Sequence, residues 1–524
     1  MKKIFLRYTR KQLAVLAGGL CSLTACVDEG LNIDAYHITD EQLMADANEG
    51  GYLLPVMMNF IVPTSTALQT VQNLQAESYA GYMESPTNFL NNVNTMTYFM
   101  VSGWNNNSWY SSTNNVMNNW LLMKRSEIDV KYPDLYAIAT IIKVAAVQRL
   151  VDTFGPYPYT QYGEGSEVPF DSEEEAYNAF FSDLDEAVTA LQAAEAADPN
   201  ADMVRFAKWD RSSLGGEYTS WIKAANSLRL RMAMRISGVS PAKAQQEAEK
   251  AVAEANGGIL DRAFEIILTA TNPYYTFATA WSDTRLSASI ETYLTGFEDP
   301  RLEAYALPAT GAGVVGQFKG IRPGVAKPDK DRYIGYSLPN ISQADPIKVI
   351  DVAEGYFLKA EGVLRGWNMG GGTAQQYYED GIRASFTYNG VSGVDEYLLS
   401  TGTQIAYVDP RNTANNSAPI STVTVQWNEA ASFEQKLEKI ITQKWIAIYP
   451  EGTEAWSEFR RTGYPRMYPI MVTNNPDLPL GTFIKRLTYP LTVISASGQA
   501  VANAVSQHLG GNDSAATPLW WDVD

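Results

Sequence analysis

Helix-start signals recur along the chain and constrain its fold more than any other feature. Three capping boxes pair a Ser or Thr with a Glu or Gln three residues later: Ser172–Glu175, Thr373–Gln376 and Ser432–Gln435. Behind the first box, apolar residues recur at the spacing of one helix face, namely Tyr177, Phe180, Phe181, Leu184, Val188 and Leu191. Such a stripe has to be buried against a neighbouring element. The sequence therefore predicts a mostly α-helical protein.

Further helices follow from the same reasoning. We expect helices over about 216–236, 241–256, 352–365, 373–388 and 432–449, several of them bounded by Pro at the first turn or Gly after the last. Pairs such as 352–365 with 373–388 have the dimensions of tetratricopeptide-like hairpins, although the strict repeat pattern is absent. The sequence predicts hairpins that stack on one another and leave long loops free for binding.

Loop-rich stretches alternate with these helical parts. We expect a single domain over 46–524, with its helical scaffold at about 46–80, 135–260, 350–390 and 432–460. The intervening stretches are rich in Asn, Ser, Thr, Pro, Gly and aromatic residues: 81–120, 262–350 and 390–430. Loops of this length inside a compact domain are usually functional. They are therefore the expected ligand-binding parts.

The N-terminus is typical of a bacterial lipoprotein. Five basic residues precede a short apolar run and the sequence Leu23-Thr24-Ala25-Cys26. This order is that of a secretory signal peptide, and the apolar run is too short to span a bilayer. We expect cleavage after residue 25, acylation of Cys26 and a lipidated tether over 26–45, because several acyl chains together anchor a protein firmly.

Charge and residue usage exclude several functions. The formal net charge of −18 makes nucleic acid a poor partner, because a phosphate backbone requires basic patches. Only two histidines occur, and Cys26 is the one cysteine outside the signal peptide, so we predict no metal site and no cysteine nucleophile. No cofactor is expected, and a structural calcium ion stays open. A glycoside hydrolase, which needs only a pair of carboxylates, is the enzyme alternative.

Two clusters of aromatic residues in the loop-rich stretches are candidate ligand sites. Aromatic faces pack against the C–H faces of sugar rings, and Asn side chains both donate to and accept from hydroxyls. The predicted ligand-binding residues are Trp104, Asn105, Asn107, Tyr274, Tyr275 and Trp281, with Asp283 and Arg285 as a charged clamp. The alternative for each cluster is ordinary core packing, with Trp109 and Tyr110 beginning a helix that leads to Trp120.

Several motifs resemble one known family. The segment QKWIAIYPEGTEAWSEFRRTGYP at 443–465 is similar to the C-terminal signature of SusD/RagB-like proteins. Shorter matches are Asp299-Pro300-Arg301, the RLTYP segment at 486–490 and the ending PLWWD at 518–522. The chain is thereby identified as a member of a SusD-like outer-membrane lipoprotein family.

The resemblance implies both a fold and a role. It implies four tetratricopeptide-like hairpins, an irregular loop-rich ligand-binding half and a few short strands. It also implies a protein that is lipid-anchored at the surface of the outer membrane and lies as a lid over a SusC-like TonB-dependent transporter. Such a protein captures oligosaccharides, or peptides in some members, and catalyses nothing. The signature residues Trp456, Arg460, Arg461 and Tyr489 look structural in the family, so none is expected to contact ligand.

Overall fold

The computed structural model describes residues 47–165 and 167–523. The predicted signal peptide, the predicted lipidation site Cys26 and the predicted tether lie outside these residues. The chain divides after Glu49, and the unit Gly50–Asp524 is the one described below. No helix among the described residues is both long and apolar enough to cross a membrane.

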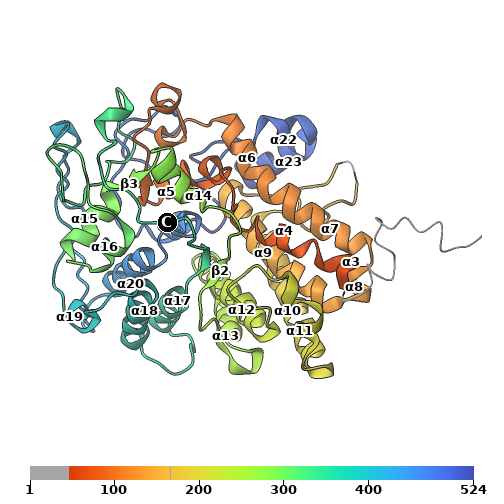
Figure 1. Cartoon of the computed structure of the whole chain (residues 1–524). Coiled ribbons are helices and arrows are strands. Elements are labelled where there is room, and N and C mark those ends of the chain that lie inside the picture. Colours follow the sequence, from red (N-terminus) through yellow and green to blue (C-terminus); the bar gives the residue numbers. More distant parts are fainter. Residues whose placement is uncertain (1–46, 166, 524) are drawn as a thin grey trace, which may run out of the picture. The chain divides into compact units, whose positions relative to one another are not determined.

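The unit is mostly helical, with few and short strands, as the sequence predicts (Figure 1). Its long helices are α9 (Pro133–Phe154), α10 (Glu173–Ala197), α12 (Tyr218–Arg235), α13 (Pro241–Val252), α17 (Val352–Leu364), α18 (Ala374–Asn389), α20 (Phe433–Ala447) and α21 (Gly452–Thr462). The shorter helices are α3 (Asn48–Gly51), α4 (Leu54–Met58), α5 (Ala76–Tyr79), α6 (Ser102–Ser112), α7 (Asn118–Arg125), α8 (Ile128–Lys131), α11 (Ala201–Arg205), α14 (Pro273–Tyr275), α15 (Ala288–Gly296), α16 (Arg301–Tyr305), α19 (Val394–Leu398), α22 (Leu491–Ala496) and α23 (Gly498–His508). Three π-helical turns also matter for the site: η3 (Gln69–Asn73), η6 (Thr113–Met117) and η9 (Thr276–Ala280).

All three predicted capping boxes are present and begin long helices. At the start of α10, the Ser172 hydroxyl accepts from the Glu175 amide at 3.2 Å, and the Glu175 carboxylate accepts from the Ser172 amide at 2.8 Å. The same reciprocal pair begins α18 and α20. Each box satisfies amides that the first helical turn would otherwise leave unpaired. These helix starts are confirmed.

The long helices pack as hairpins. Helices α9 and α10, α12 and α13, and α17 and α18 lie against each other, and α20 packs on both α17 and α18. Helix α21 contacts α5, α9 and α12. The tryptophans Trp221 of α12, Trp445 of α20 and Trp456 of α21 are fully buried. The helical scaffold therefore forms from the apolar stripes that the sequence shows.

A buried network of ion pairs joins the hairpins. Glu458 on α21 accepts from Arg235 of α12 at 2.5 Å, from Lys444 of α20 at 3.2 Å and from its own-helix neighbour Arg461 at 2.8 Å. Glu454, one turn earlier, pairs with Arg235 at 2.6 Å and with Lys444 at 2.7 Å. All five side chains are at most 5% exposed. Each buried charge is paired, which is the condition for keeping it inside a protein.

The network extends to α17 and explains part of the family-like signature. Arg461 also donates to Glu361 at 2.7 Å, and Arg231 of α12 donates to Glu354 at 2.7 Å. Arg460 instead lies over the Trp456 ring, with its guanidinium carbon 3.6 Å from the ring centroid. Arg461 therefore joins α21 to α17, while Arg460 packs on its own helix and donates to the Lys485 carbonyl at 2.7 Å. Both side chains serve the interior of the protein, which agrees with the structural role expected for them.

One expectation for the loops is wrong. Half of the stretch 81–120 is helical, because α6, η6 and α7 run almost without a break over 102–125. The segment is rich in Asn and Ser and has no apolar stripe, so periodicity could not reveal it. Trp109 nevertheless fixes it to the core by packing within 6 Å of Phe154, Tyr157, Phe170 and Tyr489.

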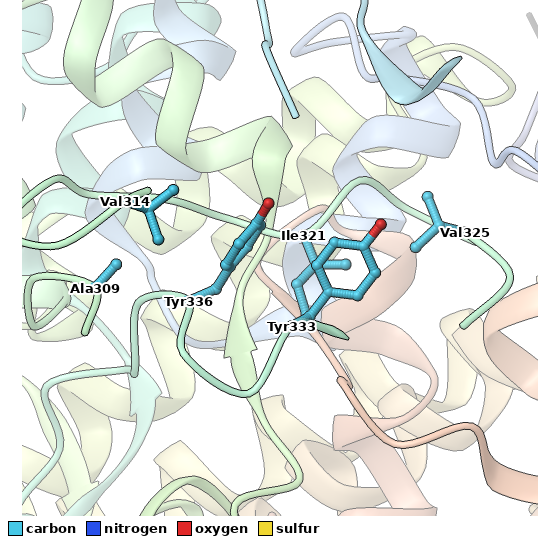
Figure 2. Close-up of a cluster of buried hydrophobic side chains, with 6 residues drawn as sticks. All are labelled: Ala309, Val314, Ile321, Val325, Tyr333 and Tyr336. Carbon is cyan, nitrogen blue, oxygen red and sulfur yellow. The ribbon is translucent and has the colours of Figure 1, made fainter. Parts of the chain in front are cut away.

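Two small antiparallel sheets position the loops. Strand β1 (Met83–Glu84) pairs with β3 (Arg285–Leu286), and β2 (Phe264–Ile266) pairs with β4 (Ile347–Ile350). The first pair brings the segment after residue 84 beside the segment that ends at residue 284. The long loop 306–336 has its own buried cluster, in which Tyr333 and Tyr336 pack beside Ile321 (Figure 2). Their hydroxyls both donate to Asp409.

Candidate functional site

Trp281 is the most exposed of the predicted aromatic residues. It follows η9 and is 42% exposed. Buried Phe277 lies beneath it, with the ring centroids 5.6 Å apart and the planes inclined by 33°. A large ring that is supported on one side and open to solvent on the other is suited to stacking against a flat ligand.

Asp283 anchors the segment that carries Trp281. Its carboxylate accepts from Lys330 at 2.7 Å, from Thr87 at 2.5 Å and from Gln69 at 3.5 Å. The Lys330 ammonium also donates to the Trp281 carbonyl at 2.6 Å. Four segments that are distant in sequence therefore meet at one carboxylate, and they hold the backbone on both sides of Ser282, which has a φ of +55°.

Trp104 lies on the neighbouring helix α6 and is half-buried. Phe89 meets it edge-on at 6.0 Å, and Leu90 beside Phe89 is 56% exposed. Exposed Asn107 donates to Thr70 of η3 at 2.9 Å. Because Gln69 of the same turn bonds to Asp283, η3 joins the two tryptophan-bearing segments. We call the group of Trp104, Asn107, Phe89, Leu90, Trp281 and Lys330, linked through η3 and Asp283, the aromatic platform.

Most of the other predicted site residues are buried. Asn105 is 1% exposed and donates to the Thr488 carbonyl at 3.1 Å, so its amide serves the interior. Tyr275 is half-buried. Arg285 is 3% exposed and donates to the carbonyls of Ile334 and Thr284, so it does not act as the surface clamp that the sequence suggested.

Tyr274 lines a partly open cavity of ≈370 Å³. Only 4% exposed, it donates to the Glu77 carboxyl and accepts from Gln72 at 3.2 Å. Burial raises the pKa of Glu77 to about 8, and it outweighs the hydrogen bonds from Tyr274 and Gln72, which lower the pKa. This cluster keeps Tyr274 in the core, although η9 connects it directly to Trp281.

The carboxylates that line this cavity have structural partners. Asp345 accepts from the Ser342 amide at 2.8 Å and from the Ser342 hydroxyl at 2.5 Å. Glu451 pairs with Arg149 at 2.8 Å and accepts from the Thr453 amide at the start of α21. Glu451 makes these contacts through Oε1, and its Oε2 is buried without a hydrogen-bond partner.

A metal site was not predicted, and calcium was left open. Within 47–165 and 167–523, no group of three or more His, Cys, Asp or Glu side chains is arranged to hold a metal ion.

The sequence missed part of the platform. Phe89, Leu90 and Lys330 belong to irregular segments without helical or strand periodicity. Contacts between distant segments, such as those of Thr87 and Lys330 with Asp283, hold these segments near Trp281. The signal that could have found Phe89 and Leu90 was an apolar pair inside an Asn-rich, polar loop.

Replacing Lys330 by Met should weaken ligand binding about 3–10-fold. The substitution keeps the apolar stem of the side chain but removes the ammonium that Trp281 and Asp283 share. Exposed charges of this kind usually contribute about 1 kcal/mol. Isothermal titration calorimetry with a ligand that the wild type binds measures the change. Lys359→Met, on α17, is the matched control and should leave affinity unaltered. An unchanged affinity in Lys330→Met would show that the ammonium does not position Trp281.

Comparisons with known proteins agree on one family. A family model described as "Susd and RagB outer membrane lipoprotein" matches residues 30–522. No curated protein matches the chain.

Solved structures also match over nearly their full length. A chitin-binding SusD homologue from Flavobacterium johnsoniae is 40% identical, with a TM-score of 0.86 over 91% of this chain and 98% of that one. A SusD-like protein from Bacteroides thetaiotaomicron is 34% identical, with a TM-score of 0.84 over 91% and 99%. A SusD homologue from Bacteroides vulgatus is 32% identical, with a TM-score of 0.84 over 91% and 98%. The chain belongs to the SusD/RagB family of outer-membrane lipoproteins.

Proposed function

We propose that this protein captures neutral glycans on its aromatic platform, with oligosaccharides of β-linked N-acetylglucosamine as the first candidates, and does not cleave them. The observation that carries the proposal is the exposed Trp281 ring, supported by Phe277 and held by the Asp283–Lys330 pair. The 40% identical structural relative is described as chitin-binding. The acidic net charge of −18 favours neutral over acidic glycans.

The platform offers the chemistry that a pyranose chain needs. Trp281 and Trp104 provide rings for the C–H faces of the sugar, and the Asn107 and Lys330 side chains provide donors for hydroxyl or acetamido oxygens. Shallow stacking sites of this kind give modest affinity, because few ligand atoms are enclosed.

We further propose that the protein is anchored at the cell surface by lipid on Cys26 and passes its glycan to a SusC-like TonB-dependent transporter. The family description as an outer-membrane lipoprotein and the lipoprotein-like N-terminal sequence support this role.

A glycan panel tests the proposal. The form that begins after Cys26 is titrated with chitohexaose, other neutral oligosaccharides, acidic glycans and mixed peptides, and reducing ends are assayed in parallel. We expect micromolar-to-millimolar binding of chitohexaose and no new reducing ends. If only peptides bound, the ligand would be a peptide and not a glycan. If reducing ends were released, the protein would be a glycoside hydrolase.

A further inference from the structure

A second cavity lies in the helical scaffold, away from the aromatic platform. It has a volume of ≈610 Å³, is lined mainly by α7, α9 and α10, and is partly open to solvent. In Figure 1, α7 and α10 lie to the right of α14 and β3, which flank the Trp281 segment. Ligand sites in proteins typically span about 300–1,000 Å³, so the volume suits a small molecule.

Two aromatic rings form one wall of this cavity. Trp120 of α7 and Tyr136 of α9 are both half-buried, with centroids 5.7 Å apart and planes inclined by only 31°. The Trp120 indole N–H donates to the Thr140 hydroxyl at 3.3 Å, which fixes the orientation of the ring. The wall is therefore preformed.

A buried lysine closes the base of the cavity. Lys143 interrupts the apolar stretch of α9 and is 3% exposed. Its ammonium lies 3.8 Å from the Trp120 ring centroid and 4.5 Å from that of Tyr159, and it pairs with Asp183 of α10 at 2.8 Å. Asp183 and the two rings already neutralise the ammonium of Lys143. Lys143 therefore holds the Trp120 ring in place and does not require an anionic ligand.

The remaining lining is polar at the rim and small along α10. Asp129 and Glu186 supply carboxylate acceptors, and Ser182 supplies a hydroxyl. Lys124 supplies a cationic donor, with its ammonium 5.6 Å from the Trp120 ring centroid. Ala187 and Ala190 leave the space open where larger residues would fill it. Aromatic rings combined with polar donors and acceptors recognise a polyhydroxylated ring. The carboxylates of Asp129, Asp183 and Glu186 outnumber the ammonium groups of Lys124 and Lys143 in the lining, which disfavours acidic sugars.

We propose that this α7–α9–α10 cavity is a second saccharide site, which holds one or two neutral sugar rings against Trp120 and Tyr136. The inference goes beyond the proposed function, because the aromatic platform can bind its glycan without it. A chain long enough to reach both sites would gain avidity from the second contact without any new residue at the first.

The test first removes the Trp281 ring from the platform and then fills the α7–α9–α10 cavity with a larger side chain. Isothermal titration calorimetry with N,N′-diacetylchitobiose compares wild type, Trp281→Ala and the double variant Trp281→Ala/Ala190→Phe. We expect Trp281→Ala to keep one weak binding event and Ala190→Phe to reduce its affinity at least tenfold. Trp281→Ala/Ala193→Phe, which places the same ring on the exposed side of α10, is the matched control and should retain the weak event.

Thermal unfolding shows whether Trp281→Ala/Ala190→Phe is folded. If it is not folded, the double variant Trp281→Ala/Tyr136→Ala takes its place in the titration. Absence of residual binding in Trp281→Ala overturns the second site and leaves the platform intact. Residual binding that survives both Ala190→Phe and Tyr136→Ala overturns it as well. Absence of binding in wild type contradicts the second site and also the ligand class proposed for the platform.

Discussion

Replacing Glu458 by Gln should lower the free energy of unfolding by about 3–5 kcal/mol, because removing one partner of a buried ion pair leaves the other charge uncompensated. Three cations depend on this carboxylate: Arg235 at 2.5 Å, Lys444 at 3.2 Å and Arg461 at 2.8 Å. They belong to α12, α20 and α21, so the loss should loosen the helical scaffold as a whole.

Urea unfolding followed by circular dichroism measures this effect. Asp380→Asn, an exposed carboxylate on α18, is the control and should change stability by less than about 0.5 kcal/mol. A Glu458→Gln variant as stable as wild type would mean that the network contributes no net stability to the fold.

The same network should govern stability in acid. Burial alone would raise the pKa of Glu454, but Arg235, Lys444 and Arg231 outweigh burial and lower the pKa to about 2. A carboxyl with a depressed folded-state pKa stabilises the fold above its unfolded value and loses that contribution as pH falls toward the folded value. We therefore expect wild type to lose stability between about pH 4.5 and pH 2, and Glu458→Gln to lose less over that interval because part of the contribution is already gone.

Replacing Trp281 by Ala should weaken glycan binding about 30-fold or more, since truncating a central aromatic contact typically costs 2 kcal/mol or more. The ring is 42% exposed and makes its closest aromatic contact with Phe277, so its removal should affect the fold little. Titration calorimetry with chitohexaose measures the loss.

Trp427→Ala is the matched control for this substitution. Trp427 is a half-buried tryptophan that packs on Tyr378 of α18, in the scaffold. Its removal should leave glycan affinity unchanged. Equal affinity of Trp281→Ala and wild type would exclude Trp281 from the binding surface.

Local patterns in the sequence account for much of the scaffold. Capping boxes and apolar stripes define α10, α18 and α20 because both signals depend only on residues within one helix. Helix α6 escaped this reasoning, since its Asn- and Ser-rich sequence has no stripe. The packing of Trp109 against the core stabilises this helix, and that packing cannot be read from the residues of the helix alone.

The candidate site was harder to predict for a related reason. Composition distinguished Trp281 and Trp104 as aromatic residues in irregular segments, but it could not separate them from Asn105 and Tyr274, which lie in the core. Exposure depends on how η3, β1 and β3 come together over about 200 residues of chain. Lys330 joins Asp283 only through that assembly, so no local motif reveals it.

The crystal structure of the protein in complex with chitohexaose tests the central claim most directly. The account predicts intact glycan with a sugar ring stacked on the Trp281 indole and neighbouring rings extending toward Trp104. A glycan bound elsewhere with Trp281 bare, or a cleaved glycan, would contradict it.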